Sequence, residues 1–495
     1  MSALAWTAAG SLAAWCWLLL CQGFFWRTDQ RLPPRRRDPE HWPAVVVVVP
    51  ARDEAEVLPL SLPSLLGQEY PGRAEVVLVD DNSTDGTAAE ARAIAARCGG
   101  LPLTVTTPGE PEPGWTGKLW ALRHGMALAE ERGPEFLLLT DADIAHDPDS
   151  LRELVASAVC GAAGRAGHMS APHLSGAHMS TEHMSGAPMS DAHMSDAPTS
   201  SASMSAPHTS SGPVSDAHMS GVPMSDAHVS DASTDPSGPG AAPGDPDPGS
   251  GAVTGTGTTP VGTPGFDAVS LMARLRVAGG WERLVIPAFV YFFAQLYPFR
   301  RVNSPASRTA AAAGGCVLLR TDAARRAGVP ASIRQAVIDD VTLARAVSDT
   351  GGRIWLGLAD RVHSVRPYPR LRDLWRMVSR SAYTQLRHSP VLLAGTVAGL
   401  LLVYVVPPVA LVAGLVSGDA AAAWAGGLAW AVMSGTFLPV LRYYGLSPLT
   451  APALPFTAVL YLLMTVDSAI RHHRGRGAAW KGRTYARPEA APGRR

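Results

Sequence analysis

Long uncharged stretches at both ends of this 495-residue chain set the strongest limit on its fold. Residues 2–26 carry no charge and are rich in Ala, Leu and Trp. A helix of this length spans a bilayer core of about 30 Å. Three further apolar stretches, each long enough for one crossing, lie at residues 391–416, 420–440 and 452–470. A water-exposed domain can therefore form only between these two sets.

Basic residues beside the apolar stretches predict their orientation. Five arginines lie between residues 27 and 37, and the tail from residue 471 is strongly basic. Because basic flanks remain in the cytosol, we expect the N-terminus outside and the following domain at the cytoplasmic face of the plasma membrane. The missing charged leader disfavours a cleaved signal peptide.

The three C-terminal stretches conflict with this orientation. If all three crossed the membrane, the basic tail would lie outside the cell. We therefore expect that one stretch is re-entrant or in-plane, with the stretch broken by Pro407 and Pro408 as the candidate, or that the tail violates the rule. A shorter apolar segment at residues 284–299 is expected to be an interfacial or buried helix.

Residues 163–264 differ from the rest of the chain in composition and charge. Serine recurs at every fifth position from Ser170 to Ser230, and the segment holds nine acidic residues against one basic residue, a net charge of −8. It lacks the large apolar residues that could offset its chain entropy, so we expect a disordered insertion. The other residues, 41 basic and 33 acidic, carry +8, although the whole chain is formally neutral. This excess beside apolar segments favours anionic lipid headgroups and a nucleotide diphosphate as partners, not nucleic acid.

Strand and helix patterns alternate between the membrane segments. Such alternation predicts an α/β fold with a doubly wound, mostly parallel sheet, whose ligands bind beyond the carboxyl ends of the strands. After the insertion, residues 314–320 resemble a glycine turn that leads into a strand. The expected earlier elements are strands at residues 44–49, 75–79, 103–106 and 136–140, a helix ending at residue 66 and a helix at 117–132.

Acidic residues collect at the ends of three of these strands. They are Asp53 and Glu54, Asp80 and Asp81, and Asp141 and Asp143. A single such residue could simply cap a helix or form a turn, as Asp85 could. Two like charges one residue apart after a buried strand repel unless a cation lies between them, however. The last pair therefore predicts a hard cation that takes its remaining ligands from water and substrate phosphates, which indicates a diphosphate donor.

Three other sites carry candidate chemistry. Lys118 begins a helix, where its ammonium and free N–H groups can meet phosphate oxygens, unless it is only a solvated surface lysine. Asp339 and Asp340 begin the helix that runs to about residue 348, either as a cap or as a general base for an acceptor hydroxyl. A probable amphipathic helix before the membrane carries a set that either clamps phosphate or contacts lipid headgroups. Its members are Arg376, Arg380, Gln385, Arg387 and His388.

Six motifs in order resemble family 2 glycosyltransferases of the GT-A fold. They read VVVVVPARDEAEVL, VDDNSTDGT, GWTGKLWAL, LLLTDADIAHDP, GGCVLLR and IDDVTLA. The resemblance covers nearly all of the chain outside the insertion. Within the family, GWTGKLWA, IDDVTLA and SAYTQLRHSP together are similar to the membrane-bound hopene-associated branch.

The resemblance implies an inverting, metal-dependent transfer of a sugar from a nucleotide diphosphate to a hydroxyl. The placement of the apolar segments favours a lipid acceptor, of hopanoid type if the branch holds. Gln385 and Arg387 are two residues apart with no following Trp, which departs from the motif of processive members and favours transfer of one sugar or few. For the donor, the resemblance implies base and ribose binding by Asp53 or Glu54 and by Asp80 or Asp81. It implies Mg²⁺ or Mn²⁺ binding by Asp141 and Asp143, and stabilisation of the diphosphate by Lys118. For the acceptor, it implies that Asp340 is the general base, with Asp339 beside it.

Parts of the sequence are also compatible with two other functions. A membrane scaffold could bind the donor without turnover. An isoprenoid diphosphate enzyme is disfavoured because its aspartate motifs lie on helices, whereas Asp80 and Asp81 end a strand. The expected organisation is a transmembrane helix (1–27), a nucleotide-sugar-binding half (40–162), the insertion (163–264), an acceptor and catalytic half with interfacial helices (265–389), a C-terminal membrane region (390–470) and a basic tail (471–495).

Overall fold

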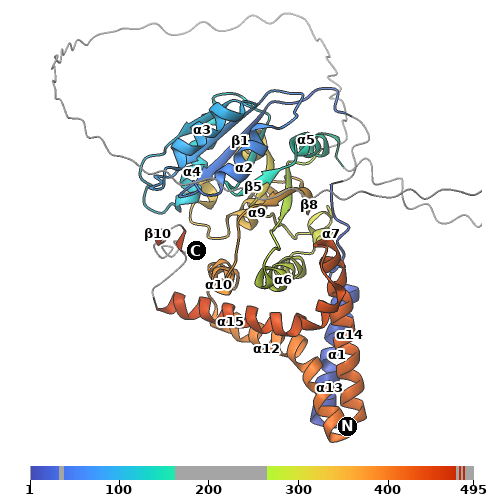
Figure 1. Cartoon of the computed structure of the whole chain (residues 1–495). Coiled ribbons are helices and arrows are strands. Elements are labelled where there is room, and N and C mark those ends of the chain that lie inside the picture. Colours follow the sequence, from blue (N-terminus) through green and yellow to red (C-terminus); the bar gives the residue numbers. More distant parts are fainter. Residues whose placement is uncertain (1, 33–37, 162–264, 475–478, 481–482, 485–495) are drawn as a thin grey trace, which may run out of the picture. The chain divides into compact units, whose positions relative to one another are not determined.

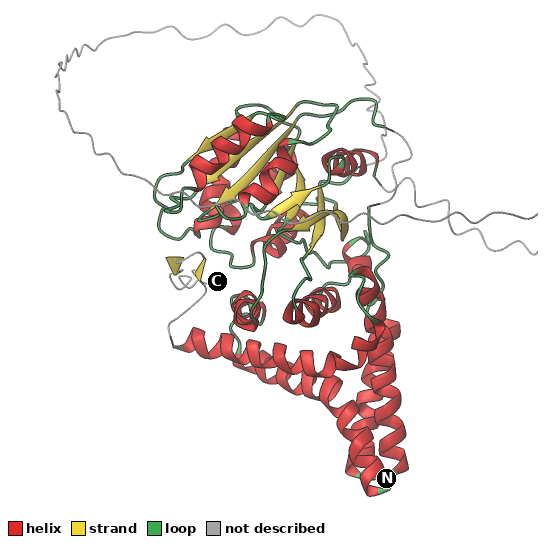
Figure 2. Ribbon diagram, in the orientation of Figure 1, coloured by secondary structure: helices red, strands yellow, loops and turns green. Residues whose placement is uncertain are grey.

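A computed structural model describes residues 2–32, 38–161, 265–474, 479–480 and 483–484. The insertion predicted at 163–264 and most of the basic tail lie outside these residues. Figure 1 shows a sheet domain above a set of long helices, and Figure 2 shows that most of the strands lie in that domain. The fold is therefore an α/β domain joined to terminal apolar helices, as the sequence predicted.

The domain is built on an eight-stranded sheet of order β3-β2-β1-β4-β7-β6-β8-β5. The first four strands in this order are parallel, whereas β7 is antiparallel to both of its neighbours. The four strands expected before the insertion are confirmed. The strands are β1 Val45–Ala51, β2 Ala74–Asp80, β3 Leu103–Thr106, β4 Phe136–Thr140, β5 Ile144–His146, β6 Ala268–Arg274, β7 Cys316–Arg320 and β8 Ile354–Ser364.

Helices cover both faces of the sheet. The valine run of β1 is buried throughout, since Val47 packs into the core on one face and Val48 into the core on the other. This two-sided burial is what a continuous apolar strand predicts. The helices of the domain are α2 Leu58–Leu66, α3 Thr87–Cys98, α4 Gly117–Glu130, α5 Ser150–Cys160, α8 Thr321–Arg326, the 3₁₀ turn η1 Ala331–Ile333 and α9 Asp339–Asp349.

The antiparallel strand β7 brings the two halves of the domain together. Thr140 at the end of β4 pairs with Cys316 at the start of β7. The turn before β7, at Gly314 and Gly315, therefore lies beside Asp141. A parallel strand at this place would have put the turn at the opposite edge of the sheet.

The two sides of the insertion meet within the sheet domain. Phe266 donates its backbone N–H to the carbonyl of Ala158 at 2.8 Å. The end of α5 and the residues before β6 therefore lie side by side.

Four helical segments are long and apolar enough to cross a membrane, judged by length and composition in the described residues. Helices α1, α13 and α14 pack together as a bundle, whereas α12 and α15 lie side by side across the end of that bundle (Figure 1). The segments are α1 Ala3–Cys21, then α12 Pro390–Leu400, the π-helix η2 Leu401–Val405 and α13 Val406–Ser417, then α14 Ala420–Tyr443, and last η3 Pro448–Ala453 with α15 Leu454–His473.

The change of direction between α12 and α13 falls at η2, immediately before Pro407 and Pro408. Proline lacks an N–H and its ring clashes with the preceding turn, so this pair accounts for the break. The stretch that the sequence marked as interrupted thus has one part along the bundle and one part across it.

Short helices connect the sheet domain to α15. Trp375 Nε1 donates to Asp467 at 2.7 Å, and Tyr461 Oη donates to the carbonyl of Val285 at 3.0 Å. The apolar segment expected at residues 284–299 falls in α6, whose inner face is buried. These elements are α6 Gly280–Leu296, α7 Phe299–Val302, α10 Leu371–Ser379 and α11 Ala382–Gln385, and a small hairpin, β9 Ala479–Trp480 with β10 Arg483–Thr484, follows in the tail.

The single amphipathic helix expected through residues 376–388 is instead two short helices, α10 and α11. Arg387 and His388 have φ angles of 52° and 53°, in the left-handed region, which ends the helical turn. Arg376 and Arg380 therefore lie on one element, and Arg387 and His388 lie beyond the next.

Candidate active site

A cavity of about 1110 Å³ lies between the carboxyl edge of the sheet and helices α6, α10 and α15. Its sheet wall includes most of the predicted site. The opposite wall comes from helices beside the apolar segments, which the sequence had not placed near the strand ends. The predicted residues that line the cavity are Glu54, Lys118, Asp141, Asp143, Asp339, Asp340, Arg376, Arg380 and His388.

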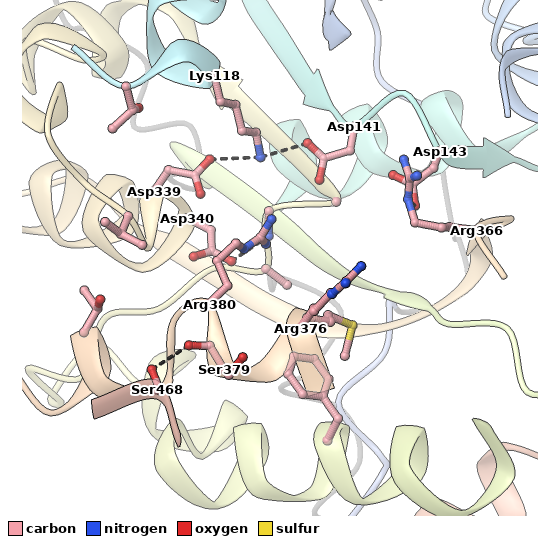
Figure 3. A pocket seen from close by; sticks show the side chains of 18 of the residues that line it. Lys118, Asp141, Asp143, Asp339, Asp340, Arg366, Arg376, Ser379, Arg380 and Ser468 are labelled. Atoms are coloured by element: carbon pink, nitrogen blue, oxygen red, sulfur yellow. Dashed lines mark hydrogen bonds and ion pairs between the residues drawn. The ribbon is translucent and has the colours of Figure 1, made fainter. Parts of the chain in front are cut away.

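Lys118 joins the two halves of the domain. It lies in the first turn of α4, and its Nζ is 2.8 Å from Asp141 Oδ1 and 3.0 Å from Asp339 Oδ2. Burial disfavours the ammonium, but the two carboxylates outweigh burial and raise the pKa of Lys118. Lys118 is thus a fixed positive charge in the wall of the cavity, between Asp141 and Asp339 (Figure 3), and not the solvated surface lysine of the alternative interpretation.

The surroundings of Asp141 have opposing effects on its pKa. Burial raises its pKa, Lys118 lowers it, and the charge of Asp143 raises it again, with a net upward shift. A further positive charge at this place would therefore favour the ionised form.

Asp143 and Glu54 share one arginine. Arg366, in the loop after β8, contacts Asp143 Oδ2 through Nε at 3.3 Å and both oxygens of Glu54 through Nη2 at 2.7 and 2.6 Å. Ser364 Oγ also donates to Asp143 Oδ2, at 2.9 Å. Burial opposes the charge of Arg366, but Asp143 and Glu54 raise its pKa. These contacts hold the side chain of Asp143 at the wall of the cavity.

Asp340 begins α9 and faces the glycine turn. Its Oδ2 accepts the N–H of Gly314 at 2.9 Å and its Oδ1 accepts the N–H of Val341 at 2.8 Å. Burial, followed by the charge of Asp339, raises the pKa of Asp340 to about 6. Burial also acts on Asp339, but Lys118 outweighs it and lowers the pKa of Asp339. Asp340 therefore both accepts a free N–H of the first helical turn and has the pKa of a group that can accept a proton near neutral pH.

The other predicted acidic residues brace the loops after β1 and β2 and do not line the cavity. Asp53 Oδ1 accepts the N–H of Thr84 at 2.9 Å, and Asp80 Oδ1 accepts that of Ser83 at 3.1 Å. Asp81 is fully buried, 3.2 Å from Arg52 Nη1. Asp85 accepts the N–H of Thr87 at 3.0 Å at the start of α3, which is its expected capping role.

Gln385 and Arg387 also lie outside the lining of the cavity. Gln385 donates to the hydroxyl of Tyr297, and Arg387 is exposed. Of the arginines predicted on this segment, Arg376 and Arg380 reach the cavity.

Several residues of the site lie in segments that the sequence did not mark as functional. Arg366 and Tyr368 follow β8, a strand that the sequence did not predict, so no site was expected at its carboxyl end. Arg471 and Arg474 were assigned only to a basic tail, yet both line the cavity. The HSVRPYP sequence at the end of β8 was the available signal for the first pair.

The donor set at Asp141 and Asp143 fits a hard divalent cation. Both carboxylates lie on one wall, separated in the chain only by buried Ala142. The described residues provide no group of three or more His, Cys, Asp or Glu that would hold a metal alone. Mg²⁺ or Mn²⁺ held by one or two carboxylates takes its other ligands from water and substrate phosphates, so two protein ligands suffice.

Comparisons with known proteins concern mainly the first half of the sheet domain. The family model described as glycosyl transferase family 2 matches residues 46–164. Among curated relatives, the probable glycosyltransferase YdaM of Bacillus subtilis is 31% identical over 130 residues, covering 26% of this chain and 30% of the relative. The 4,4'-diaponeurosporenoate glycosyltransferase of Staphylococcus haemolyticus is 32% identical over 110 residues, covering 22% and 27%. The chain thus spans less than a third of the length of these relatives.

A solved structure, the mannosyltransferase PcManGT from Pyrobaculum calidifontis in complex with GDP-Man and Mn²⁺, aligns with 94% of this chain and 99% of its own. Its TM-score is 0.43 and its sequence identity is 16%. Over residues 46–164 the chain thus matches the model of family 2 glycosyltransferases.

Proposed function

We propose that the protein is a membrane-bound inverting glycosyltransferase that transfers a sugar from a nucleotide diphosphate to a hydroxyl of a lipid. One observation carries this proposal: the Lys118–Asp141 ion pair and the carboxylate of Asp340 line the same cavity. The first can receive the diphosphate, and the second can receive the proton of the attacking hydroxyl. A single displacement needs both in one space.

In the proposed reaction, the acceptor oxygen forms a bond to the anomeric carbon as the bond from that carbon to the diphosphate breaks. Asp340 takes the acceptor proton. The ammonium of Lys118 stabilises the negative charge that develops on the leaving diphosphate. When bound by Asp141 and Asp143, Mg²⁺ or Mn²⁺ would supply further positive charge beside the same phosphates.

The role of Asp339 follows from its contacts. It fixes Lys118 from the acceptor half at 3.0 Å, and its charge raises the pKa of Asp340. We assign it a positioning role. Asp53 or Glu54 and Asp80 or Asp81 remain our candidates for base and ribose binding, with Glu54 favoured because it lines the cavity.

A lipid acceptor is supported by the composition of the far wall. Apolar side chains of β6, the segment after it, and α6 line the cavity between Asp340 and the long apolar helices: Met272, Leu275, Phe289 and Phe293. The curated relatives are named as glycosyltransferases, and one is named for 4,4'-diaponeurosporenoate. The hopanoid type of acceptor rests on the sequence resemblance to the hopene-associated branch.

We further propose three membrane crossings, by α1, α13 and α14, with α12 and α15 in the plane of the cytoplasmic face. The segment from η2 through α13 has 5 and 12 residues, about 26 Å at 1.5 Å per residue, which is close to a bilayer core. This topology puts the sheet domain and the basic tail on the same side, as the basic flanks require. It would make this a multi-pass plasma membrane protein with a cytoplasmic site.

The proposed activity is tested by incubating membranes that contain the protein with a panel of nucleotide sugars and a lipid extract, with and without EDTA. We expect sugar to appear in the lipid fraction, to be lost with EDTA and to return with Mg²⁺ or Mn²⁺. Asp340→Asn should lower the rate by about 10²- to 10⁴-fold while nucleotide binding is retained. Transfer that persists in this variant would contradict the mechanism, and donor binding without any transfer would favour the scaffold.

A further inference from the structure

The wall of the cavity opposite the sheet is basic. Helix α10 and its end contribute Arg376 and Arg380, and the end of α15 contributes Arg471 and Arg474. We call these four residues the arginine wall. Arg376 and Arg380 are four residues apart and therefore share a face of the helical turn.

Most of this charge has no carboxylate partner within the described residues. Asp467 lies in the same wall, but Arg471 Nε at 2.8 Å and Trp375 Nε1 at 2.7 Å already contact its Oδ2. Asp373 is 3.8 Å from Arg372, which does not line the cavity. Arg376, Arg380 and Arg474 are left without an ion pair to a described residue.

The helix dipoles account for part of this placement. Positive side chains near the last turn of a helix interact favourably with its dipole, which suits Arg376 and Arg380 at the end of α10 and Arg471 and Arg474 at the end of α15. Like charges four residues apart on one helical face are mildly destabilising, however. The dipoles do not require that both helix ends face one cavity, whereas a bound anion shared by their arginines would favour that arrangement.

The arginine wall is separate from the expected donor site. Lys118 and Asp141 lie at the sheet edge, and Asp340 lies between them and α10 (Figure 3). Arg380 projects toward Asp340 in Figure 3, and its charge lowers the pKa of neighbouring Asp339. An anion on this wall would thus be on the acceptor side of the general base.

Apolar surface continues from the arginine wall. Met377 on α10 and Phe289 and Phe293 on α6 line the same cavity. A molecule that fills both parts has an acidic head and an apolar body. Arginine recognises phosphate and carboxylate through paired, charge-assisted hydrogen bonds.

We propose that the arginine wall is an anion subsite for a phosphate or carboxylate group of an amphiphilic acceptor, which it holds with the reacting hydroxyl next to Asp340. This inference rests on the proposed function in taking the bound amphiphile to be the acceptor. The anion subsite restricts the proposed class of acceptor to lipids with an acidic head and disfavours wholly neutral alcohols.

The test uses the full chain in phosphatidylcholine nanodiscs and three probes: octyl phosphate, octanol and inorganic phosphate. We expect octyl phosphate to bind more tightly than either of the others. Arg376→Gln with Arg380→Gln should weaken octyl phosphate binding by about 10- to 100-fold and leave octanol binding unchanged. Arg372→Gln, on the same helix but outside the cavity lining, is the matched control and should bind normally.

Equal affinity for octyl phosphate and octanol would overturn the proposal, as would equal affinity for octyl phosphate and inorganic phosphate. The proposal would also be overturned if the double variant bound octyl phosphate as tightly as the wild type and had the same melting temperature. That result would indicate that the arginines contact bilayer headgroups. Nucleotide binding is measured on the same samples. If octyl phosphate binds as expected but no nucleotide binds, the proposed function fails and the anion subsite stands.

Discussion

Gly314 donates its backbone N–H to Oδ2 of Asp340 at 2.9 Å, so the turn before β7 holds the candidate general base. A Cβ at Gly314 would lie 3.4 Å from both Cβ and Oδ2 of Asp340. The turn is beside Asp141 because β7 runs antiparallel to β4. The base and the donor-side carboxylates are thus positioned by one strand pairing.

The pH dependence of catalysis should follow Asp340. Burial and Asp339 raise its pKa to about 6, so kcat/KM should fall as the pH drops below about 6 and the base becomes protonated. Asp339→Asn removes the neighbouring charge and should move this limb to lower pH. Asp349→Asn, at the exposed end of the same helix, is the control and should not shift it. A limb that does not move in Asp339→Asn would contradict the coupling.

The same pKa shift predicts an effect on stability. A carboxyl group whose pKa is raised on folding stabilises the folded state most at low pH, and this contribution is lost as the pH rises through about 6. Asp340→Asn removes the penalty of the charge. The melting temperature of the variant relative to wild type should therefore be higher at pH 8 than at pH 5. The same difference at both pH values would show that Asp340 is not perturbed.

Loss of Lys118 should disable the donor side of the site. Lys118→Met leaves Asp141 and Asp339 without their shared cation. We expect kcat/KM to fall by about 10²- to 10³-fold, together with weaker binding of the nucleotide diphosphate in a calorimetric titration. Arg123→Met, an exposed residue on the same helix α4, controls for a general effect of lost positive charge. Similar losses in both variants would exclude a specific role.

Arg366 should matter through the carboxylates that it pairs. Glu54 is buried, so Arg366→Met removes the cation that contacts both of its carboxylate oxygens and should lower the melting temperature clearly. Arg366→Lys has a single nitrogen, whereas the arginine uses Nε for Asp143 and Nη2 for Glu54, so this variant should recover only part of the loss. Arg361→Met breaks an exposed pair with Asp149 and should change stability little. Adding Glu54→Gln to Arg366→Met should restore stability, and a failure to do so would place the effect elsewhere.

Removal of the insertion should leave the catalytic domain folded. Ala158 and Phe266 are joined by a backbone hydrogen bond at 2.8 Å on the two sides of it, so a short glycine-serine linker in place of residues 165–262 can close the chain. We expect the deletion variant to retain transfer activity and its melting temperature. Loss of activity in a protein that still melts cooperatively would show that the insertion takes part in function.

The sequence by itself determined the elements whose cause is local. The valine run of β1, the pair Asp141 and Asp143 after β4, and the helix that begins at Asp339 were predicted because burial period, strand ends and helix starts leave a pattern in consecutive residues. The uncharged stretches likewise marked the long apolar helices.

Only the tertiary structure decided which distant residues share the cavity. The antiparallel pairing of β7 brings Gly314 to Asp141, the loop after β8 brings Arg366 to Glu54, and the bend before Pro407 separates α12 from α13. It also brings Arg474, assigned from the sequence to a basic tail, to the same cavity as Arg380. Strand order and helix packing depend on contacts between residues far apart in the chain, and such contacts leave no periodic signal in a single sequence.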